Sequence, residues 1–414
     1  MRIVADLHLH SKYSRACSKQ LTLENIGLWC QYKGISIIGT SDFTHPAWFN
    51  DIKNQLEESE PGLYKLKNSD VPTRFILSTE ISCIYKQGGK VRRVHVCILM
   101  PTINSVEKII DNFQKRGFNL KADGRPIIGF SAKELARLVL EIEPRSLVIP
   151  AHIWTPWFAV FGSKSGFDSL EECFEDITPY IYAVETGISS DPIMNWRVSM
   201  LDDITLLSNS DAHSLNNLGR EANVFDISPE KLSYDEIYRI IKEKDKNNFL
   251  YTIEFFPEEG RYHVDGHASC KYFANPEESE KNKNICPVCL KPLTLGVLHR
   301  INDLCDRKII PEKIKIPYKN LIPLQEIISE AVSVGKNSKK VLAIYFDAVK
   351  KYSEFEILID LDEKELFKIF DKEVVNAILN VRNGNVLINP GYDGVYGTVK
   401  IITNSKKAQQ KPLF

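Results

Sequence analysis

The sequence is marked first by what it lacks. Its 414 residues carry a formal net charge of −1, so the chain as a whole is not a basic nucleic-acid binder, and such a role would need a local patch. No apolar stretch is long enough to cross a membrane, and the N-terminal MRIVADLHLH lacks the pattern of a signal peptide. We therefore expect a cytoplasmic protein with no membrane partner.

Other familiar patterns are missing as well. The nine cysteines are scattered, which is typical of reduced thiols and metal ligands and not of a disulfide framework. We find no internal repeat, and no Ser-His-Asp or Cys-His motif that would supply a side-chain nucleophile. The length predicts two or three domains, and the 43% hydrophobic content is enough for a large core.

The first half of the chain alternates between short apolar runs and helix-like segments. The runs are 2–10, 34–42, 74–82, 92–100, 145–153, 180–188 and 204–213, and the helix-like segments include 21–33, 105–115, 131–143 and 168–174. This alternation predicts a parallel sheet that is buried on both faces. Because seven strand candidates end in polar residues, we expect a barrel with its site at the strand ends.

Histidines and carboxylates gather at these strand ends. Asp6, His8 and His10 alternate along the first strand, which predicts that they share one face. The later candidates are Glu80, His95, His152, Asp211 and His213. Imidazole with carboxylate suits Zn²⁺, Mn²⁺ or Fe²⁺ better than Mg²⁺ alone, and one carboxylate such as Glu80 can bridge two metals about 3.5–4 Å apart. The alternative is that these are only polar residues of half-buried strands.

A second metal motif lies further along the chain. Cys286 and Cys289 form a CxxC knuckle, and His267 with Cys270 forms an HxxC pair upstream. Four such ligands are typical of a closed, tetrahedral, structural zinc site. A redox role would need a thioredoxin-like βαβ context, which is absent. His267 has alternatives as the fourth ligand, namely His263, Asp265 and Cys305.

The secondary-structure pattern of the sequence changes after about residue 255. Residues 257–309 are loop-rich and need a staple such as a metal, whereas 311–402 is helical in pattern, with helices expected at 323–334, 339–351, 363–372 and 372–382. Between Lys281 and Asn320 there are nine Lys or Arg against three Asp or Glu, which indicates a surface for a phosphate backbone or simply a solvated face. The final dozen residues are polar and predicted to be disordered.

The run DLHLHS, the lone Glu80, and the motifs at His95, His152 and Asp211-x-His213 resemble the PHP (polymerase and histidinol phosphatase) superfamily. This resemblance implies a distorted (β/α)7 barrel with two or three metals. It places one metal on His8, His10, Glu80 and Asp211, a second on Glu80, His95 and His152, and His213 at a third. Phe43 stands where the superfamily has a third-site histidine, and another histidine is replaced within 13–17. Asp42, His45 or Cys17 are the candidates to substitute.

Longer strings narrow the resemblance. GTSDFTHPAWF (39–49), PAHIWTPWF (150–158), GRYHVDGH (260–267), PLTLGVLHR (292–300) and PGYDGVYG (390–397) occur in this order, and with SDAHS (210–214) they resemble the endonuclease Q family over about 1–402. The family implies a barrel (1–255), a zinc-binding domain (256–312), a helical DNA-binding domain (313–402) and here a flexible tail (403–414).

The resemblance to the endonuclease Q family also implies an activity. Its members nick DNA on the 5′ side of deaminated bases (uracil, hypoxanthine, xanthine) and abasic sites. The expected cofactors are two or three divalent barrel metals (Zn, Mn or Mg) and one structural Zn, the expected partner is damaged DNA, and the expected location becomes the nucleoid.

The chemistry assigns roles to individual residues. Metal-bound water would be the nucleophile, with Glu80 and Asp211 as catalytic carboxylates among the ligands and Asp6 as a carboxylate that supports them. A base must leave the duplex to be inspected. Candidate DNA contacts are Trp48, Trp154, Trp157, Arg300 and Tyr392, together with Phe158 and Tyr396. Loop packing is the alternative for the aromatic residues.

Three further hypotheses remain open at this point. A small-molecule phosphatase of the histidinol-phosphate type would need neither the zinc motif nor the basic segment. A DNA-binding module without catalysis would hold the knuckle zinc alone. The terminal Gln410–Phe414 resembles a peptide that binds a DNA sliding clamp, with Leu413 and Phe414 in an apolar pocket.

Overall fold

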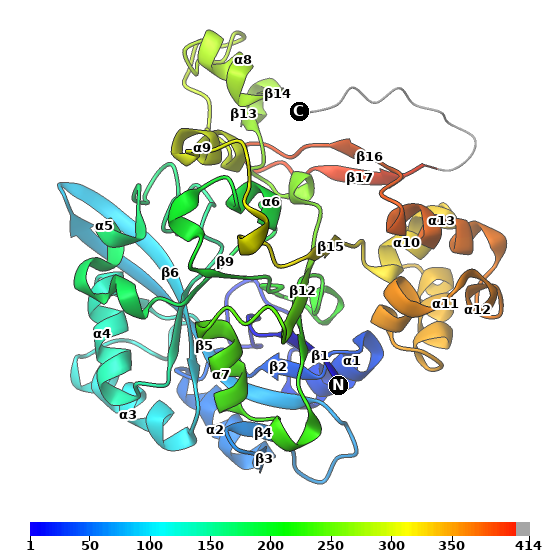
Figure 1. The fold of residues 1–414 in the computed structure, drawn as a ribbon, viewed down its shortest axis with the longest axis horizontal. Coiled ribbons are helices and arrows are strands. Elements are labelled where there is room, and N and C mark those ends of the chain that lie inside the picture. The colour runs from blue at the N-terminus through cyan, green and yellow to red at the C-terminus, as the bar shows by residue number, and fades with distance from the viewer. Residues whose placement is uncertain (403–414) are drawn as a thin grey trace.

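The computed structural model describes residues 1–402, and the predicted clamp-binding segment 410–414 lies outside them. All seven predicted strands are present and together form one barrel (Figure 1). They are β1 (Arg2–Asp6), β2 (Ile37–Gly39), β5 (Arg74–Gln87), β6 (Lys90–Met100), β8 (Leu147–Pro150), β9 (Ala183–Glu185) and β10 (Thr205–Leu207). The predicted α/β barrel fold is confirmed.

Main-chain pairing closes the ring of strands. β1 runs parallel to β2, β2 to β5, and β9 to β10. Beyond the strand ends, the amide of Asp211 donates to the carbonyl of His8 (2.9 Å) and the amide of His10 to that of Ala212 (3.0 Å). The first strand is therefore joined to the last at the rim where the polar residues gather.

The inside of the barrel is packed with apolar side chains. Ile3, Ala5 and Leu7 of the first strand belong to a buried cluster with residues of the other strands. Helix α7 (Tyr234–Lys242) adds Ile237, Ile240 and Ile241 to the same cluster. The barrel is thus a filled core, and the functional groups lie at its rim.

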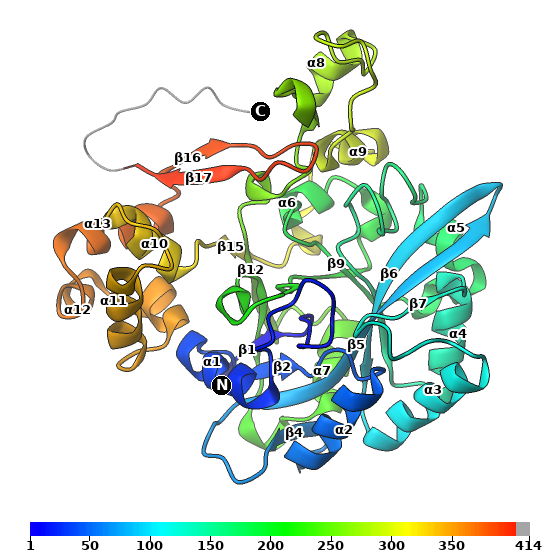
Figure 2. The ribbon, with the colours of Figure 1, turned by 180° about the vertical axis from the view of Figure 1, so that it is seen from behind.

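Among the seven predicted strands, β6 departs from the predicted all-parallel arrangement. β6 pairs antiparallel with both β5 and β8. The reason is local, because a tight turn at Gly88 and Gly89, with φ of 59° and 73°, joins β5 directly to β6 and leaves no room for a crossover helix. The resulting hairpin projects from the barrel (Figure 2).

Helices cover the outside of the barrel. The four helices predicted in this half are confirmed as α1 (Leu23–Lys33), α3 (Ile103–Lys115), α4 (Ala132–Ile142) and α5 (Leu170–Phe174), whereas α2 (Pro46–Gln55), α6 (Pro192–Asn195) and α7 were not predicted. The sheet that contains β1, β2 and β5 also contains β3 (Leu56–Glu60), β4 (Leu63–Leu66), β7 (Ile127–Ile128), β11 (Ala222–Asp226) and β12 (Phe249–Glu254). Thr102 and Ser131 begin α3 and α4 with capping boxes, which stabilise the first turn of each helix.

The loop-rich segment beyond the barrel contains small elements that the sequence did not reveal. They are β13 (Asp265–His267), β14 (Tyr272–Ala274), α8 (Pro276–Lys281), α9 (Val297–Leu304) and β15 (Tyr318–Asn320). β13 and β14 form an antiparallel pair, and β15 pairs with β12 and so extends the barrel sheet.

The last part is helical, with one exception. α10 (Leu324–Ala331), α11 (Lys339–Val349), α12 (Glu363–Phe367) and α13 (Lys372–Arg382) match the predicted helices. The exception is a hairpin of β16 (Val386–Asn389) and β17 (Thr398–Ile401), where helix was expected. Its turn contains the Gly-rich string 390–397, and the amides of Gly391 and Gly397 donate to the carbonyls of Glu258 and Glu259, so the hairpin packs against the start of the loop-rich segment.

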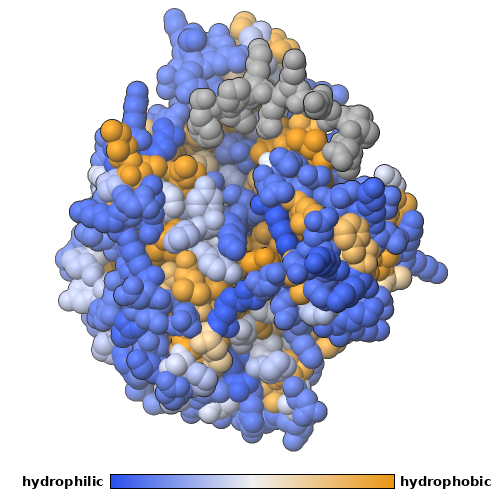
Figure 3. Space-filling view, turned by 45° about the vertical axis from the view of Figure 1, so that its right-hand side comes forward, coloured by the Kyte–Doolittle hydropathy of each residue, from blue (hydrophilic) through white to orange (hydrophobic). Residues whose placement is uncertain are grey.

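The surface of residues 1–402 has no broad apolar band on the face of Figure 3, where hydrophobic residues form separate patches among hydrophilic ones. In the same residues, no helix is both long and apolar enough to cross a membrane.

Candidate active site

Four predicted ligands converge at the rim of the barrel. His8, His10, Glu80 and Asp211 each offer one atom, and these atoms lie within 4.8 Å of one another. Nε2 of His10 is 3.2 Å from Oε2 of Glu80 and 3.1 Å from Oδ1 of Asp211, and Nε2 of His8 is 3.5 Å from the same Glu80 oxygen. These four side chains therefore form a candidate cation site.

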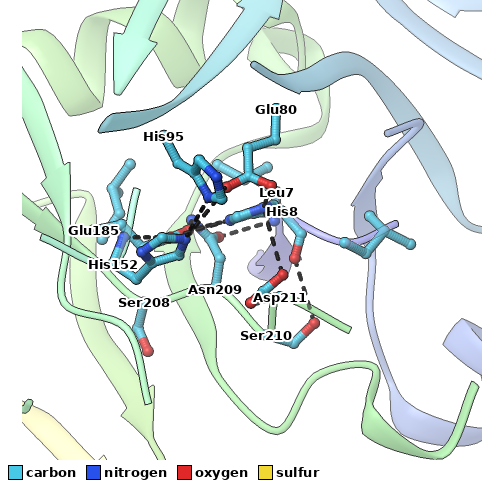
Figure 4. Close-up of polar contacts among 12 residues, drawn as sticks. Leu7, His8, Glu80, His95, His152, Glu185, Ser208, Asn209, Ser210 and Asp211 are labelled. Atoms are coloured by element: carbon cyan, nitrogen blue, oxygen red, sulfur yellow. Dashed lines mark hydrogen bonds and ion pairs between the residues drawn. The ribbon is translucent and has the colours of Figure 1, made fainter. Parts of the chain in front are cut away.

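A second cluster shares Glu80. Its other oxygen, Oε1, lies 2.7 Å from Nδ1 of His95 and 3.3 Å from Nε2 of His152 (Figure 4). Glu80 is thus the residue common to both groups, as expected for a bridging carboxylate. Glu80 and His95 lie within β5 and β6 rather than at their ends, because the hairpin carries both strands past the rim.

Three atoms of the first cluster lack a hydrogen-bond partner, and their position shows whether a metal fits the site. Nε2 of His8, Nε2 of His10 and Oδ1 of Asp211 are buried and have no hydrogen-bond partner. A buried polar atom without a partner costs about 1–3 kcal/mol, and three such atoms facing one point would be strongly unfavourable without a ligand. The residues present therefore fit a divalent cation held by nitrogen and oxygen.

The electrostatics of the clusters agree with this fit. Burial alone would lower the pKa of His10, but Asp211, Asp42 and Glu80 outweigh burial and raise it well above its ordinary value. Burial likewise would raise the pKa of Asp211, but His10 and His8 hold it well below its usual range. For His95 burial prevails and lowers the pKa to about 4, so this imidazole is neutral near pH 7. The rim concentrates negative charge that a cation would neutralise.

Glu185, at the end of β9, was missed by the sequence analysis. Its carboxylate accepts from Nδ1 of His8 (3.0 Å), from the amide of His152 (2.9 Å) and from the side chain of Asn209 (2.9 Å), and it is fully buried. By accepting this hydrogen bond it holds the proton on Nδ1 and leaves Nε2 of His8 free to bind a metal. Its place at a strand end was the available signal, but the run YAVETGI holds no neighbouring histidine to draw attention to it.

The backbone is held in an unusual conformation at two ligands. His152 and Asp211 have φ of 31° and 45°, a region that costs non-glycine residues free energy and is common at functional sites. Asp6 helps to hold the second of these turns, because its carboxylate accepts from the amides of Ser210 (3.0 Å) and Gly219 (2.9 Å). Asp6 thus supports the backbone beside Asp211 and contacts no ligand side chain. His8 and His10 follow the end of β1, which ends at Asp6.

The residues proposed for a third metal do not join either ligand cluster among residues 1–402. Asp42 is fully buried beside the first cluster: its Oδ1 lies 3.3 Å from Nδ1 of His10, and its Oδ2 accepts from the amide and hydroxyl of Ser11 and the hydroxyl of Ser14. His45 caps α2 and stacks on Tyr13 at 4.3 Å. His213 packs against His10 with ring centroids 4.6 Å apart, and neither it nor Cys17 joins a ligand cluster among residues 1–402. A third site that uses Asp42 or His45 therefore stays a prediction.

The cysteine motif forms a separate cluster. His267, Cys270, Cys286 and Cys289 place their ligand atoms within 4.8 Å of one another, and Nδ1 of His267 lies 3.6 Å from Sγ of Cys289. The three alternatives for His267 are engaged elsewhere or lie outside this cluster: Asp265 binds His299, Cys305 contacts Asn302, and His263 is buried apart. One nitrogen and three sulfurs suit a tetrahedral structural zinc.

Three of the candidate DNA contacts have structural roles in this conformation. Trp48 is fully buried and its indole donates to the carbonyls of Thr40 and Ser41, and Trp154 is 1% exposed and donates to Asn195. Arg300 donates to the carbonyls of Phe161 and Phe167 and pairs with Asp168. Their side chains are thus used in packing the loops.

The remaining aromatic candidates are more accessible. Trp157 meets Tyr262 edge to face at 5.7 Å, and Tyr392 stacks on Phe273 at 5.0 Å, and both are partly buried. Tyr396 is 65% exposed. Phe158 instead packs on the ring of His95 at 4.6 Å.

Comparison with solved structures decides the family. The crystal structure of the lesion-specific endonuclease PfuEndoQ from Pyrococcus furiosus superposes with a TM-score of 0.86 at 30% identity, covering 99% of this chain and 98% of that one. This chain belongs to the endonuclease Q family. An endonuclease Q structure in complex with a 27-mer duplex, with an abasic lesion at the active site, gives the same TM-score and identity over the full length of both chains. The family predicted from the sequence motifs is confirmed.

Sequence relatives agree. Residues 323–385 match the family model of the MJ0043 C-terminal domain. The uncharacterized protein MJ0043 of Methanocaldococcus jannaschii is 33% identical over 71% of this chain, but this chain spans only 39% of its length. The uncharacterized protein YqxK of Bacillus subtilis is 28% identical over 96% of this chain and 99% of its own length.

Proposed function

We propose that this chain is a metal-dependent DNA repair endonuclease that hydrolyses the phosphodiester on the 5′ side of deaminated bases and abasic sites. The observation that carries the proposal is the rim of the barrel, where Glu80 joins two ligand clusters and where buried atoms of His8, His10 and Asp211 in the first cluster have no hydrogen-bond partner. Membership of a family with a lesion-specific endonuclease, one solved with an abasic duplex, supplies the class of substrate.

The chain's own residues would divide the work. His8, His10, Glu80 and Asp211 would hold one divalent cation, and Glu80, His95 and His152 a second. Such cations, when bound, polarise a phosphoryl oxygen and make water a nucleophile near neutral pH. Glu185 would keep Nδ1 of His8 protonated, and Thr155, whose hydroxyl lies 3.2 Å from Nδ1 of His152, would orient that ring.

Lesion recognition would use groups beyond the clusters. Inspection of a base requires its removal from the duplex, which is easiest for weakly paired or missing bases. Trp157 and Tyr392 are the partly exposed aromatic candidates for stacking against DNA. The predicted division of labour is a catalytic barrel (1–255), a zinc-stapled unit (256–312) that holds zinc on His267, Cys270, Cys286 and Cys289, and a helical DNA-binding part (313–402).

A nicking assay tests the proposal directly. End-labelled duplexes carrying one deoxyuridine, deoxyinosine or abasic site are incubated with protein and Mg²⁺, Mn²⁺ or Zn²⁺, beside undamaged DNA. We expect one nick immediately 5′ of the lesion. Glu80→Gln should abolish it, because Glu80 contacts both clusters.

Surface Glu363→Gln serves as the matched control, since Glu363 is exposed on α12. Cleavage of phosphate monoesters but of no lesion duplex would support the phosphatase alternative and reject the endonuclease. A metal content near one per chain, with no cleavage, would support the module without catalysis.

A further inference from the structure

Arg125 is a basic residue at the edge of the ligand clusters that the sequence motifs did not single out. Its Nη1 donates to Oε2 of Glu80 at 2.9 Å. This is the same oxygen that lies 3.2 Å from Nε2 of His10. The guanidinium therefore touches the carboxylate shared by both clusters.

Most of the hydrogen-bonding capacity of Arg125 remains unused. A guanidinium has five N–H donors in a planar fork, and among residues 1–402 its side chain makes no hydrogen bond other than the one to Glu80. The Arg125 side chain is 26% exposed, whereas that of Glu80 is fully buried. One side of the fork is thus anchored at the clusters and the other side faces solvent.

The loop that carries Arg125 is fixed against the first ligand motif. Asp123 accepts from the amides of Arg125 (3.2 Å) and Arg15 (3.3 Å), and the amide of Gly124 donates to the carbonyl of Tyr13 (3.2 Å). A Cβ on Gly124 would overlap the carboxylate of Asp42, so only glycine lets the loop lie this close. The position of Arg125 is therefore set by the fold.

We propose that Arg125 is a substrate-binding residue of the active site, which donates its free N–H groups to a non-bridging oxygen of the scissile phosphodiester. The geometry of the fork matches phosphate oxygens, and charge-assisted bonds of this kind are roughly twice as strong as neutral ones. The anion would lie between the cluster cations and a fixed positive charge. This inference rests on the proposed endonuclease function.

The test compares Arg125→Ala and Arg125→Lys with Arg15→Ala. Arg15 is a matched control for charge, because its side chain is 81% exposed and pairs with Asp123 at 3.4 Å without reaching Glu80. We measure kcat/KM on a lesion duplex, metal content, and cleavage of duplexes with a pure Rp or Sp phosphorothioate at the scissile phosphate. Loss of one charge-stabilising donor typically lowers the rate by about 10²–10³.

We expect kcat/KM of Arg125→Ala to fall about 10²-fold with unchanged metal content. In the parent, sulfur in place of a non-bridging oxygen should slow cleavage, and Arg125→Ala should lose this slowing for one of the two phosphorothioate diastereomers only. Arg125→Lys should recover part of the loss, and Arg15→Ala should stay within about threefold of the parent. Gly124→Ala, which displaces the loop and removes no charge, should resemble Arg125→Ala. Parallel loss of metal, or sulfur effects that do not change, would assign Arg125 to holding Glu80 and overturn the proposal.

A second readout separates this proposal from the proposed function. Inorganic phosphate binding to the metal-loaded protein is measured by calorimetry, whether or not any lesion is cut. We expect Arg125→Ala to weaken it about tenfold, the order of one charged hydrogen bond. If the parent cuts no lesion DNA, the endonuclease fails; if phosphate binds both proteins equally, the role of Arg125 fails.

Discussion

Glu185 fixes the orientation of His8 although it was absent from the predicted ligand set. It accepts from Nδ1 of His8 and from the amide of His152, and so contacts residues of both clusters. Replacing the carboxylate by an amide would keep the shape but remove the charge that fixes the proton on Nδ1. A glutamate is needed here for electrostatic reasons, which residue spacing alone does not reveal.

For Glu185→Gln we expect metal affinity and nicking to fall about 10–100-fold with an intact fold, the usual cost of losing such a support. Competition with a metal chelator measures the affinity, and circular dichroism checks the fold. Glu363→Gln is the control. Unchanged affinity would mean that Glu185 serves the packing of the barrel alone.

Glu254 makes stability depend on pH. This residue is fully buried, accepts from Thr252 at 2.5 Å, and pairs with no cation among residues 1–402. Burial, with Asp191 nearby, raises its pKa to about 8 from 4.5. The protonated form is thus favoured in the folded state, so the contribution of Glu254 is fully present below pH 4.5 and is lost as the pH rises to about 8.

Glu254→Gln removes this dependence. We expect the apparent Tm of the variant to exceed that of the parent by roughly 2 °C or more at pH 8.5, and the difference to vanish at pH 5. Thermal melts across that range measure it, with Glu363→Gln as the exposed control. An equal difference at both pH values would trace the effect to packing.

At the scale of elements, the knuckle should behave as an independent metal site. Its four ligands come from one short stretch and none belongs to the barrel clusters. We expect Cys289→Ser to lose one zinc per chain and to expose residues 256–312 to protease. Cys305→Ser, outside the cluster, should keep its zinc and its resistance to protease. Elemental analysis and limited proteolysis provide the measurements, and equal zinc loss in both variants would reject the ligand set.

The elements also show what the sequence could predict. The seven strands, the helices with capping boxes and both metal motifs were recognisable because each is a local pattern. The antiparallel β6 and the β16–β17 hairpin were not, because strand direction and the packing of a Gly-rich turn depend on distant partners. For the same reason no local pattern pointed to Arg125, whose partner Glu80 lies 45 residues away.

Burial separates two of the predicted DNA contacts from the others. Trp48 and Trp154 follow metal motifs in sequence, which suggested exposure at the rim, yet their indole N–H groups find partners inside the loops. An aromatic residue with a polar group can satisfy it internally, and the composition of a loop does not reveal this.

At the scale of the whole molecule, the positive charge is local. The chain has a net charge of −1, but the lysines of the basic segment are largely exposed, among them Lys281, Lys283 and Lys291 near the knuckle. The arginines of the segment are held in ion pairs, as Arg300 is with Asp168 and Arg307 with Asp202. The exposed lysines near the knuckle are therefore groups that can meet a phosphate backbone.

Replacing Lys281, Lys283 and Lys291 together by alanine should weaken DNA binding and lower the slope of log K against log salt by about 2–3, since each phosphate contact contributes about 0.9. The control replaces Lys53, Lys65 and Lys67 on α2, β4 and the turn after β4. Fluorescence anisotropy at several salt concentrations measures both. The same slope in both triple variants would locate the DNA surface elsewhere.

The closure of the ring between β1 and the Asp211 turn has a consequence for synthesis on the ribosome. His8 and His10 are made first, yet their partner Asp211 is about 200 residues away, so at about 5–20 residues per second they wait roughly 10–40 s. During that interval the nascent chain already holds Glu80 but lacks Asp211, so the four-ligand cluster is incomplete. The complete cluster therefore forms only when the Asp211 turn joins the first strand.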